Sequence, residues 1–162
     1  MVPRFSRENA SMPDMRIVEF RESYQPQLAQ LVDDVHAELG FAHDPVLDGD
    51  LDAPAEHYRH ILLLVRGRIV VGSAALTAPS AGVVTLKRMY LRPAYRKQGW
   101  GRRLLEALIW RAEQDGCGLI RLDTTERQHA ARRLYETAGF DLVRQEGHTL
   151  HYAKRLDAGG TV

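Results

Sequence analysis

The apolar positions of the chain repeat with two periods, one typical of helices and one typical of strands. Between Pro26 and Gly40 apolar residues recur every three or four positions, which predicts an amphipathic helix with proline at its start and glycine at its end. The same spacing over 104–112 and 130–138 predicts two further helices, each followed by a glycine. A short helix is also expected at 55–59.

Short apolar runs predict the strands. The earlier runs are separated by tight turns, so they should form an antiparallel meander. The later ones alternate with helices, which is typical of strand-helix-strand units. The chain is therefore predicted to have an α+β fold with a mixed sheet. The expected strands are 15–20, 60–66, 69–77, 83–93, 119–125 and a pair within 141–156 that turns at Gly147.

Length and composition favour one domain. At 162 residues and 44% hydrophobic content, the chain can bury one sizeable core. We expect a single domain over 15–156, a loosely ordered polar segment over 1–14 and a flexible tail over 157–162. The loop 41–54 is long and rich in Asp, Pro and Gly, and loops of this kind are often functional.

Charge and cysteine content narrow the class of protein. Lys and Arg number 22 against 21 Asp and Glu, so no global basic or acidic signature indicates a nucleic acid or a membrane as partner. Cys117 is the only cysteine, which excludes a disulfide within the chain and favours a reducing, cytoplasmic setting. No apolar run approaches the roughly 20 residues of a membrane span.

The segment "YRKQGWGRRLL" at 95–105 carries the first chemical signal. It places two glycines and several cations immediately before a predicted helix. Exposed amides at a helix start and the helix dipole favour phosphate, and glycine lets a ligand approach the backbone closely. Two well-known phosphate loops do not fit: no Lys-Ser or Lys-Thr follows the glycines, and Leu104 occupies the place of the third glycine of a dinucleotide fingerprint.

A second segment makes the signal specific. "VVTLKRMYLRPAYRKQGWGRRLLEALI" contains Arg-x-x-Gly-x-Gly after a strand, and "AARRLYETAGF" follows at 130–140. In this order the two blocks resemble the GNAT superfamily of N-acetyltransferases, and the resemblance extends over 15–156. It implies a GNAT-like acyl-CoA N-acyltransferase fold, with a mostly antiparallel sheet of about seven strands that splays between its fourth and fifth strands and carries about four helices.

The resemblance also assigns residues. Acetyl-coenzyme A would be the acetyl donor, with its pantetheine arm along Met89, Tyr90 and Leu91. Tyr135 matches the tyrosine that protonates the departing thiolate, and its ordinary pKa of about 10 suits an acid. Gln128 stands where relatives often carry Asn. Trp100 should point into the core while its amide binds. The pyrophosphate would lie on the backbone of Arg96, Lys97, Gln98, Gly99, Trp100, Gly101 and Arg102.

The general base and the acceptor stay open. Thr85 and Lys87 occupy the fourth-strand positions nearest to the glutamate that serves as base in many relatives. Glu38, His36 and His43 are candidates, none of which we select. Asp44 and Asp48 could attract a cation. Arg144, His148, His151 and Tyr152 are expected near the acceptor.

Two other kinds of chemistry are disfavoured. Cys117 lacks an evident partner base and is expected to be a small core residue rather than a nucleophile. The pairs His57/His60 and His148/His151 lack a complete ligand set, so no metal is expected.

The resulting hypothesis is an acetyl-CoA-dependent N-acetyltransferase that acts on the primary amine of a small molecule by direct attack in a ternary complex. The alternatives are acetylation of protein Lys or N-terminal amines, or a non-catalytic acyl-CoA sensor. The resemblance further implies a homodimer.

Overall fold

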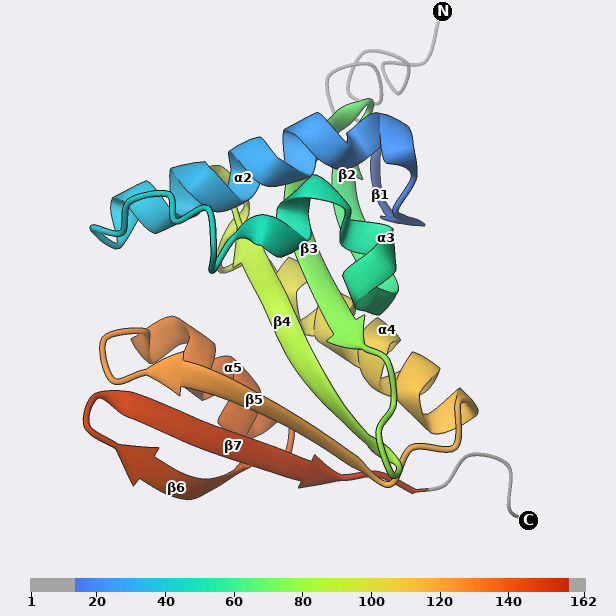
Figure 1. The fold of residues 1–162 in the computed structure, drawn as a ribbon, viewed down its shortest axis with the longest axis vertical. Helices are drawn as coiled ribbons and strands as arrows, with labels where there is room; N and C mark the ends of the chain where they lie inside the picture. The colour runs from blue at the N-terminus through green and yellow to red at the C-terminus, as the bar shows by residue number, and fades with distance from the viewer. Residues whose placement is uncertain (1–13, 158–162) are drawn as a thin grey trace, which may run out of the picture.

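The structure is a computed structural model that describes residues 14–157. The predictions of a loosely ordered start and a flexible tail concern residues that, apart from Asp14 and Asp157, lie outside this range. This range contains seven strands and four α-helices (Figure 1). They are β1 (Met15–Glu19), α2 (Gln25–Glu38), α3 (Pro54–His57), β2 (Tyr58–Arg66), β3 (Ile69–Thr77), β4 (Val83–Leu91), α4 (Trp100–Gln114), β5 (Leu119–Thr125), α5 (His129–Thr137), β6 (Asp141–Glu146) and β7 (Thr149–Arg155).

The strands form one mixed sheet in the order β1-β2-β3-β4-β5-β7-β6. Strands β1 to β4 make the predicted antiparallel meander, and β5, β7 and β6 are also antiparallel to one another. The only parallel pair among the described strands is β4 with β5, and it covers just Val83–Thr85 against Leu119–Arg121. Beyond that pair the two strands diverge, as Figure 1 shows. The predicted α+β fold and its splayed mixed sheet are confirmed.

Helices cover both faces of the meander, which explains the continuous apolar runs of β2 and β3. Leu62 and Leu64 belong to the core cluster that includes α4, whereas Leu63 and Val65 belong to the cluster under α2. Successive side chains of a strand point to opposite faces, so both sets must be apolar. Within residues 14–157, no helix is long and apolar enough to cross a membrane.

The ends of several elements differ from the prediction. Helix α4 begins at Trp100, directly after Gly99, rather than at Leu104, because its first turn is partly exposed and carries no apolar repeat. Strand β2 begins at Tyr58, two residues early, and the helix expected over 55–59 is the shorter α3.

Strand β4 contains a bulge at Arg88 that the sequence did not indicate. Arg88 has a φ of 55°, and β4 gains one residue relative to β3 at this point. The Ser73 hydroxyl donates a hydrogen bond of 2.7 Å to the Arg88 carbonyl and holds the bulge. An extra residue reverses the alternation of side chains. Leu86 and Leu91 therefore share the α4 face, whereas Tyr90 packs on the α2 face.

Candidate active site

Two cavities flank the diverging end of β4. We call the first the helix pocket; it lies between β4, the start of α4 and α5, and has a volume of about 420 Å³. It brings together most of the predicted cofactor residues with Tyr135. The predicted residues that line it are Met89, Tyr90, Leu91, Arg96, Lys97, Gly99, Gly101, Arg102 and Tyr135.

The start of α4 forms a concave run of backbone amides at the mouth of the helix pocket. Lys97 and Gly99 both adopt positive φ, 61° and 88°, and α4 begins immediately afterwards. The amides of a first helical turn have no acceptor within the helix. Amides grouped in this way bind anions, and the Lys97 and Arg102 side chains add positive charge. Phosphate chemistry fits this end of the pocket.

Gly101 keeps the helix pocket open. A Cβ atom at this position would lie 3.4 Å from Leu134, 3.5 Å from Leu91 and 3.7 Å from Met89, all of which are apolar side chains of the lining. A larger side chain would therefore fill the narrow space between β4 and α5. The unpaired edge of β4 beside this space offers backbone groups to an extended ligand arm.

Three predicted residues lie outside the helix pocket lining. The Gln98 amide donates 2.9 Å to the Ala94 carbonyl, and the Gln128 carbonyl accepts 2.6 Å from the Thr124 hydroxyl. Both glutamine side chains are thus hydrogen-bonded within their own loops. Trp100 packs against the core as expected, with the Arg103 guanidinium 4.6 Å above its ring.

Tyr135 reaches the helix pocket from α5. Its side chain is buried against Phe140 in an edge-on contact and leaves 6% of the residue exposed. Burial, with a smaller effect of the nearby Tyr90, raises the pKa of Tyr135 above its usual value. No group among residues 14–157 is hydrogen-bonded to the Tyr135 hydroxyl, so it is a free donor. The protonated phenol is thus available to a ligand atom.

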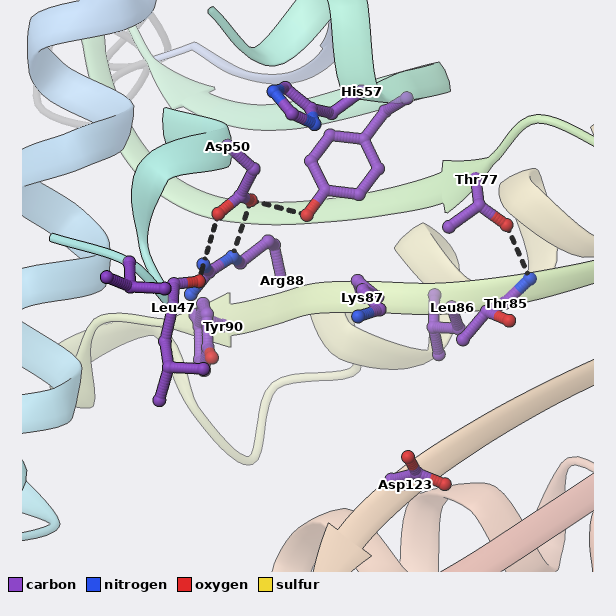
Figure 2. A pocket seen from close by; sticks show the side chains of 12 residues that line it. Leu47, Asp50, His57, Thr77, Thr85, Leu86, Lys87, Arg88, Tyr90 and Asp123 are labelled. Carbon is purple, nitrogen blue, oxygen red and sulfur yellow. Dashed lines mark hydrogen bonds and ion pairs between the residues drawn. The ribbon is translucent and has the colours of Figure 1, made fainter. Parts of the chain in front are cut away.

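The second cavity, which we call the strand cleft, lies on the other face of β4 and measures about 500 Å³. Thr85, Lys87, Arg88 and Tyr90 line it from β4, and Asp123 faces them from β5 across the gap (Figure 2). It continues into a larger cavity of about 1020 Å³ over β5, β6 and β7. Among the residues expected near the acceptor, Arg144, His151 and Tyr152 line this larger cavity, whereas His148 does not.

A buried ion network forms one wall of the strand cleft. The Arg88 guanidinium donates hydrogen bonds of 2.6 and 2.9 Å to the two Asp50 oxygens (Figure 2). It donates a further hydrogen bond of 3.2 Å to Asp48. Tyr58 donates to the same Asp50 carboxylate. Burial alone would raise the pKa of both carboxyls, but hydrogen bonds outweigh it and hold each pKa below its usual range. For Asp50 the main partner is Arg88, followed by Tyr58, and for Asp48 it is the Asp44 backbone N–H, followed by Arg88. Asp48 is thus already hydrogen-bonded to Arg88 and is not the free site for a cation that the Asp-rich loop 41–54 suggested.

The three candidate bases from the sequence have different partners and exposure in the structure. Glu38 forms a salt bridge of 2.9 Å with Arg96, and His43 is half-exposed and hydrogen-bonded to Asp33 at 3.0 Å. His36 is different, because its Nε2 lies 2.9 Å from the Tyr90 hydroxyl. No feature of the sequence pointed to this last contact, since 54 residues separate the two side chains.

The remaining sequence candidates have other surroundings. Cys117 is 1% exposed in the core, as expected. His60 bonds to Asp115 and His57 lines the strand cleft, so the two do not act as a pair. A set not considered from the sequence, Asp33, His43 and Asp48, has ligand atoms within 4.8 Å of one another.

Comparison with known proteins extends these observations. Residues 17–140 match the acetyltransferase (GNAT) family. The chain is 30% identical over 141 residues to an uncharacterized N-acetyltransferase, YjgM, of Escherichia coli K12, covering 81% of this chain and 83% of the relative. It is 34% identical over 86 residues to the ribosomal protein bS18-alanine N-acetyltransferase of E. coli K12, covering 53% and 57%.

Solved structures share the fold. A GNAT acetyltransferase from Staphylococcus aureus superposes with a TM-score of 0.81 at 20% identity and covers 89% of this chain and all of its own. An N-acetyltransferase from Thermoplasma acidophilum, solved in complex with coenzyme A, superposes with a TM-score of 0.72 at 14% identity, covering 88% of this chain and 99% of its own.

Proposed function

The chain belongs to the GNAT family of acetyltransferases, and we propose that it transfers the acetyl group of acetyl-CoA to the primary amine of a small-molecule acceptor. The observation that carries this proposal is the position of Met89–Leu91: this segment of β4 lines the helix pocket, and its Tyr90 lines the strand cleft as well. Donor and acceptor could thus approach one another from opposite faces of one strand.

The helix pocket suits acetyl-CoA. In this proposal the amides of Gly99–Arg102 and the charge of Lys97 hold the pyrophosphate, and the free edge of β4 pairs with the pantetheine arm. A backbone N–H of the same edge polarises the thioester carbonyl. Gly101 supports this assignment because the absence of a side chain here leaves the narrow space between β4 and α5 to the arm.

Direct attack needs a proton for the departing thiolate and a free path between the substrates. Tyr135 supplies the proton, since its buried hydroxyl stays protonated and has no competing acceptor among the described residues. An acetyl-cysteine route is disfavoured because Cys117 is in the core and burial raises the pKa of its thiol. Attack within a ternary complex is therefore the simpler mechanism.

A protein acceptor is the second candidate, because one relative acts on the alanine of ribosomal protein bS18. A small molecule is favoured instead because the Leu47–Asp50 loop closes one side of the strand cleft, with the Leu47 carbonyl accepting a hydrogen bond from Arg88. Parallel assays of thiol release with small amines and with short peptides of free N-terminus distinguish the two. Faster turnover of peptides at equal concentration would favour the protein acceptor.

Tyr135→Phe tests the proposed reaction. Loss of a general acid should lower kcat by about 10²–10⁴-fold while the Kd of acetyl-CoA, measured by calorimetry, stays within about twofold. Tyr95→Phe is a matched control, because Tyr95 also packs against the core but lines neither cavity. Unchanged kcat in Tyr135→Phe would contradict the acid role, and absence of any acetyl-CoA binding by the native chain would contradict the proposed function.

A further inference from the structure

Strand β4 itself offers no carboxylate to the strand cleft. Its polar lining residues before the bulge are Thr85 and Lys87, and the carboxylates of Asp48 and Asp50 are bonded to Arg88. Asp123 lines the cleft from β5, where it is hydrogen-bonded to His151. An amine that attacks a thioester must lose a proton, so a proton acceptor has to lie within hydrogen-bond reach of the nitrogen or be connected to it through a relay.

The bulge at Arg88 supplies such a connection. It turns Tyr90 toward α2, where the phenol lies 2.9 Å from Nε2 of His36 and the two rings meet edge-on, with centroids 5.4 Å apart. Tyr90 is at the same time a lining residue of both cavities. Tyr90 therefore connects the lining of both cavities to the largely buried imidazole of His36.

The surroundings of His36 suit a proton acceptor. Its side chain is 14% exposed, and burial lowers the pKa of the imidazole, so the neutral form prevails at pH 7. Nδ1 lies 4.0 Å from the Asp48 carboxylate, which favours the tautomer with its proton on Nδ1 and stabilises the imidazolium once it forms. The charged or titratable groups around the ring are Asp33 from α2, Asp48 and Asp50 from the acidic loop, and Arg88 and Tyr90 from β4.

We propose that Tyr90 and His36 form the relay that takes the proton from the acceptor amine. As the amine nitrogen bonds to the acetyl carbon, one N–H proton passes to Tyr90 Oη while the Tyr90 hydroxyl proton passes to His36 Nε2. The C–S bond breaks, and the thiolate takes the proton of Tyr135. Afterwards His36 releases one proton to solvent and Tyr135 regains one, so the cycle balances. This relay depends on the proposed acetyltransferase function.

Another imidazole in the continuous cavity is a weaker candidate. His151 is hydrogen-bonded through Nδ1 to Asp123 at 2.5 Å. Its Nε2 is buried, makes no hydrogen bond, and lies 3.4 Å from the Glu146 carboxylate. This nitrogen is therefore covered by an acidic side chain rather than open to an amine.

The test compares pH profiles of kcat/KM for the native chain and for His36→Gln, Tyr90→Phe and the double variant. Each single variant should lose about 10²-fold or more near neutral pH, and the double variant should lose no more than either, because the two residues act as one unit. The ratio of native to His36→Gln rates should shrink as the pH falls and His36 becomes protonated. The ionisation of the amine affects all profiles equally and cancels in this ratio.

Two controls make the outcome decisive. His43→Gln, an exposed imidazole that lines neither cavity, should leave the profile unchanged, and all variants should bind acetyl-CoA with native affinity. A His36→Gln rate within twofold of native, or a pH-dependent rate ratio that appears for His151→Gln instead, would overturn the relay alone. Absence of amine turnover by the native chain that binds acetyl-CoA would overturn the proposed function together with the relay.

Discussion

The helix pocket and the strand cleft share strand β4 but are built differently. Two continuous segments line the helix pocket, Met89–Arg102 and Ala130–Thr137, and they contribute glycines, apolar side chains, two tyrosines and four Arg or Lys side chains. The strand cleft is lined by side chains from four separate parts of the chain, the segment 46–58, β3, β4 and β5, with an ion network across one wall. The backbone amides of the helix pocket can keep one ligand through many sequence changes, whereas a cleft of side chains sets its specificity residue by residue.

The largest effect is expected from substituting Arg88, which belongs to the ion network in one wall of the strand cleft. Arg88→Met leaves Asp48 and Asp50 buried without their partner and should lower the free energy of unfolding by about 3–5 kcal/mol. Denaturant titration measures this loss. Arg92→Met removes the more exposed pair with Asp34 and should cost only about 0–1 kcal/mol. Equal losses for the two variants would show that the Arg88 network is not a special feature of the cleft.

The next effect concerns the helix pocket alone. Gly101→Glu places a carboxylate in the space between β4 and α5 and should weaken acetyl-CoA binding by at least about 100-fold, or ~2.8 kcal/mol. The fold should remain stable, because an acidic residue in the first turn of a helix is favourable. Calorimetry measures the affinity, with Gly118→Glu, where the added side chain meets open space, as the matched control. Native affinity in Gly101→Glu would place the cofactor elsewhere.

A smaller effect tests the backbone that precedes α4. Gly99 has a φ of 88°, so Gly99→Ala should cost roughly 1–2 kcal/mol of stability. Gly49→Ala, at a glycine without positive φ and with open space around its Cα, should be nearly neutral. Thermal unfolding of both variants provides the comparison. An equal, negligible change in both would mean that the loop does not depend on the left-handed backbone.

The smallest effect is the pH dependence of stability from the ion network. Hydrogen bonds from Arg88 to Asp50, and from the Asp44 backbone N–H and Arg88 to Asp48, outweigh burial and depress the folded-state pKa of both carboxyls. Their contribution to stability is therefore present above the ordinary pKa of Asp and is lost as the pH falls through the folded values. Native protein should therefore lose stability below about pH 4, and Arg88→Met should lose less over the same range. Parallel slopes in urea titrations at successive pH values would contradict this origin.

Most residues of the helix pocket could be grouped from the sequence because their signals are local. The order of strands and helices follows from apolar periods, and the glycines before α4 with "LYETAGF" identify the family within two short segments. The strand cleft depends on contacts that no period encodes. Arg88 is an ordinary cation in the sequence until the bulge buries it, and the contact of His36 with Tyr90 exists only after α2 packs on β4.

Gln128 illustrates a second limit of the sequence. Its amide occupies the place where relatives carry Asn, but its longer side chain folds back onto Thr124 and Thr125 and caps the loop before α5. A match of residue type alone does not predict these loop contacts, and the contact of Gln128 with the cofactor stays a prediction.

A crystal structure with bound acetyl-CoA would show directly whether the helix pocket holds the acetyl donor. We expect the pyrophosphate to lie on the amides of Gly99–Arg102, the pantetheine arm to follow Met89–Leu91, and the sulfur to lie within hydrogen-bond distance of the Tyr135 hydroxyl. The thioester should then face the strand cleft beside Tyr90. A pyrophosphate bound away from the start of α4, or a sulfur on the far side of α5 from Tyr135, would show that the donor does not occupy the helix pocket as proposed.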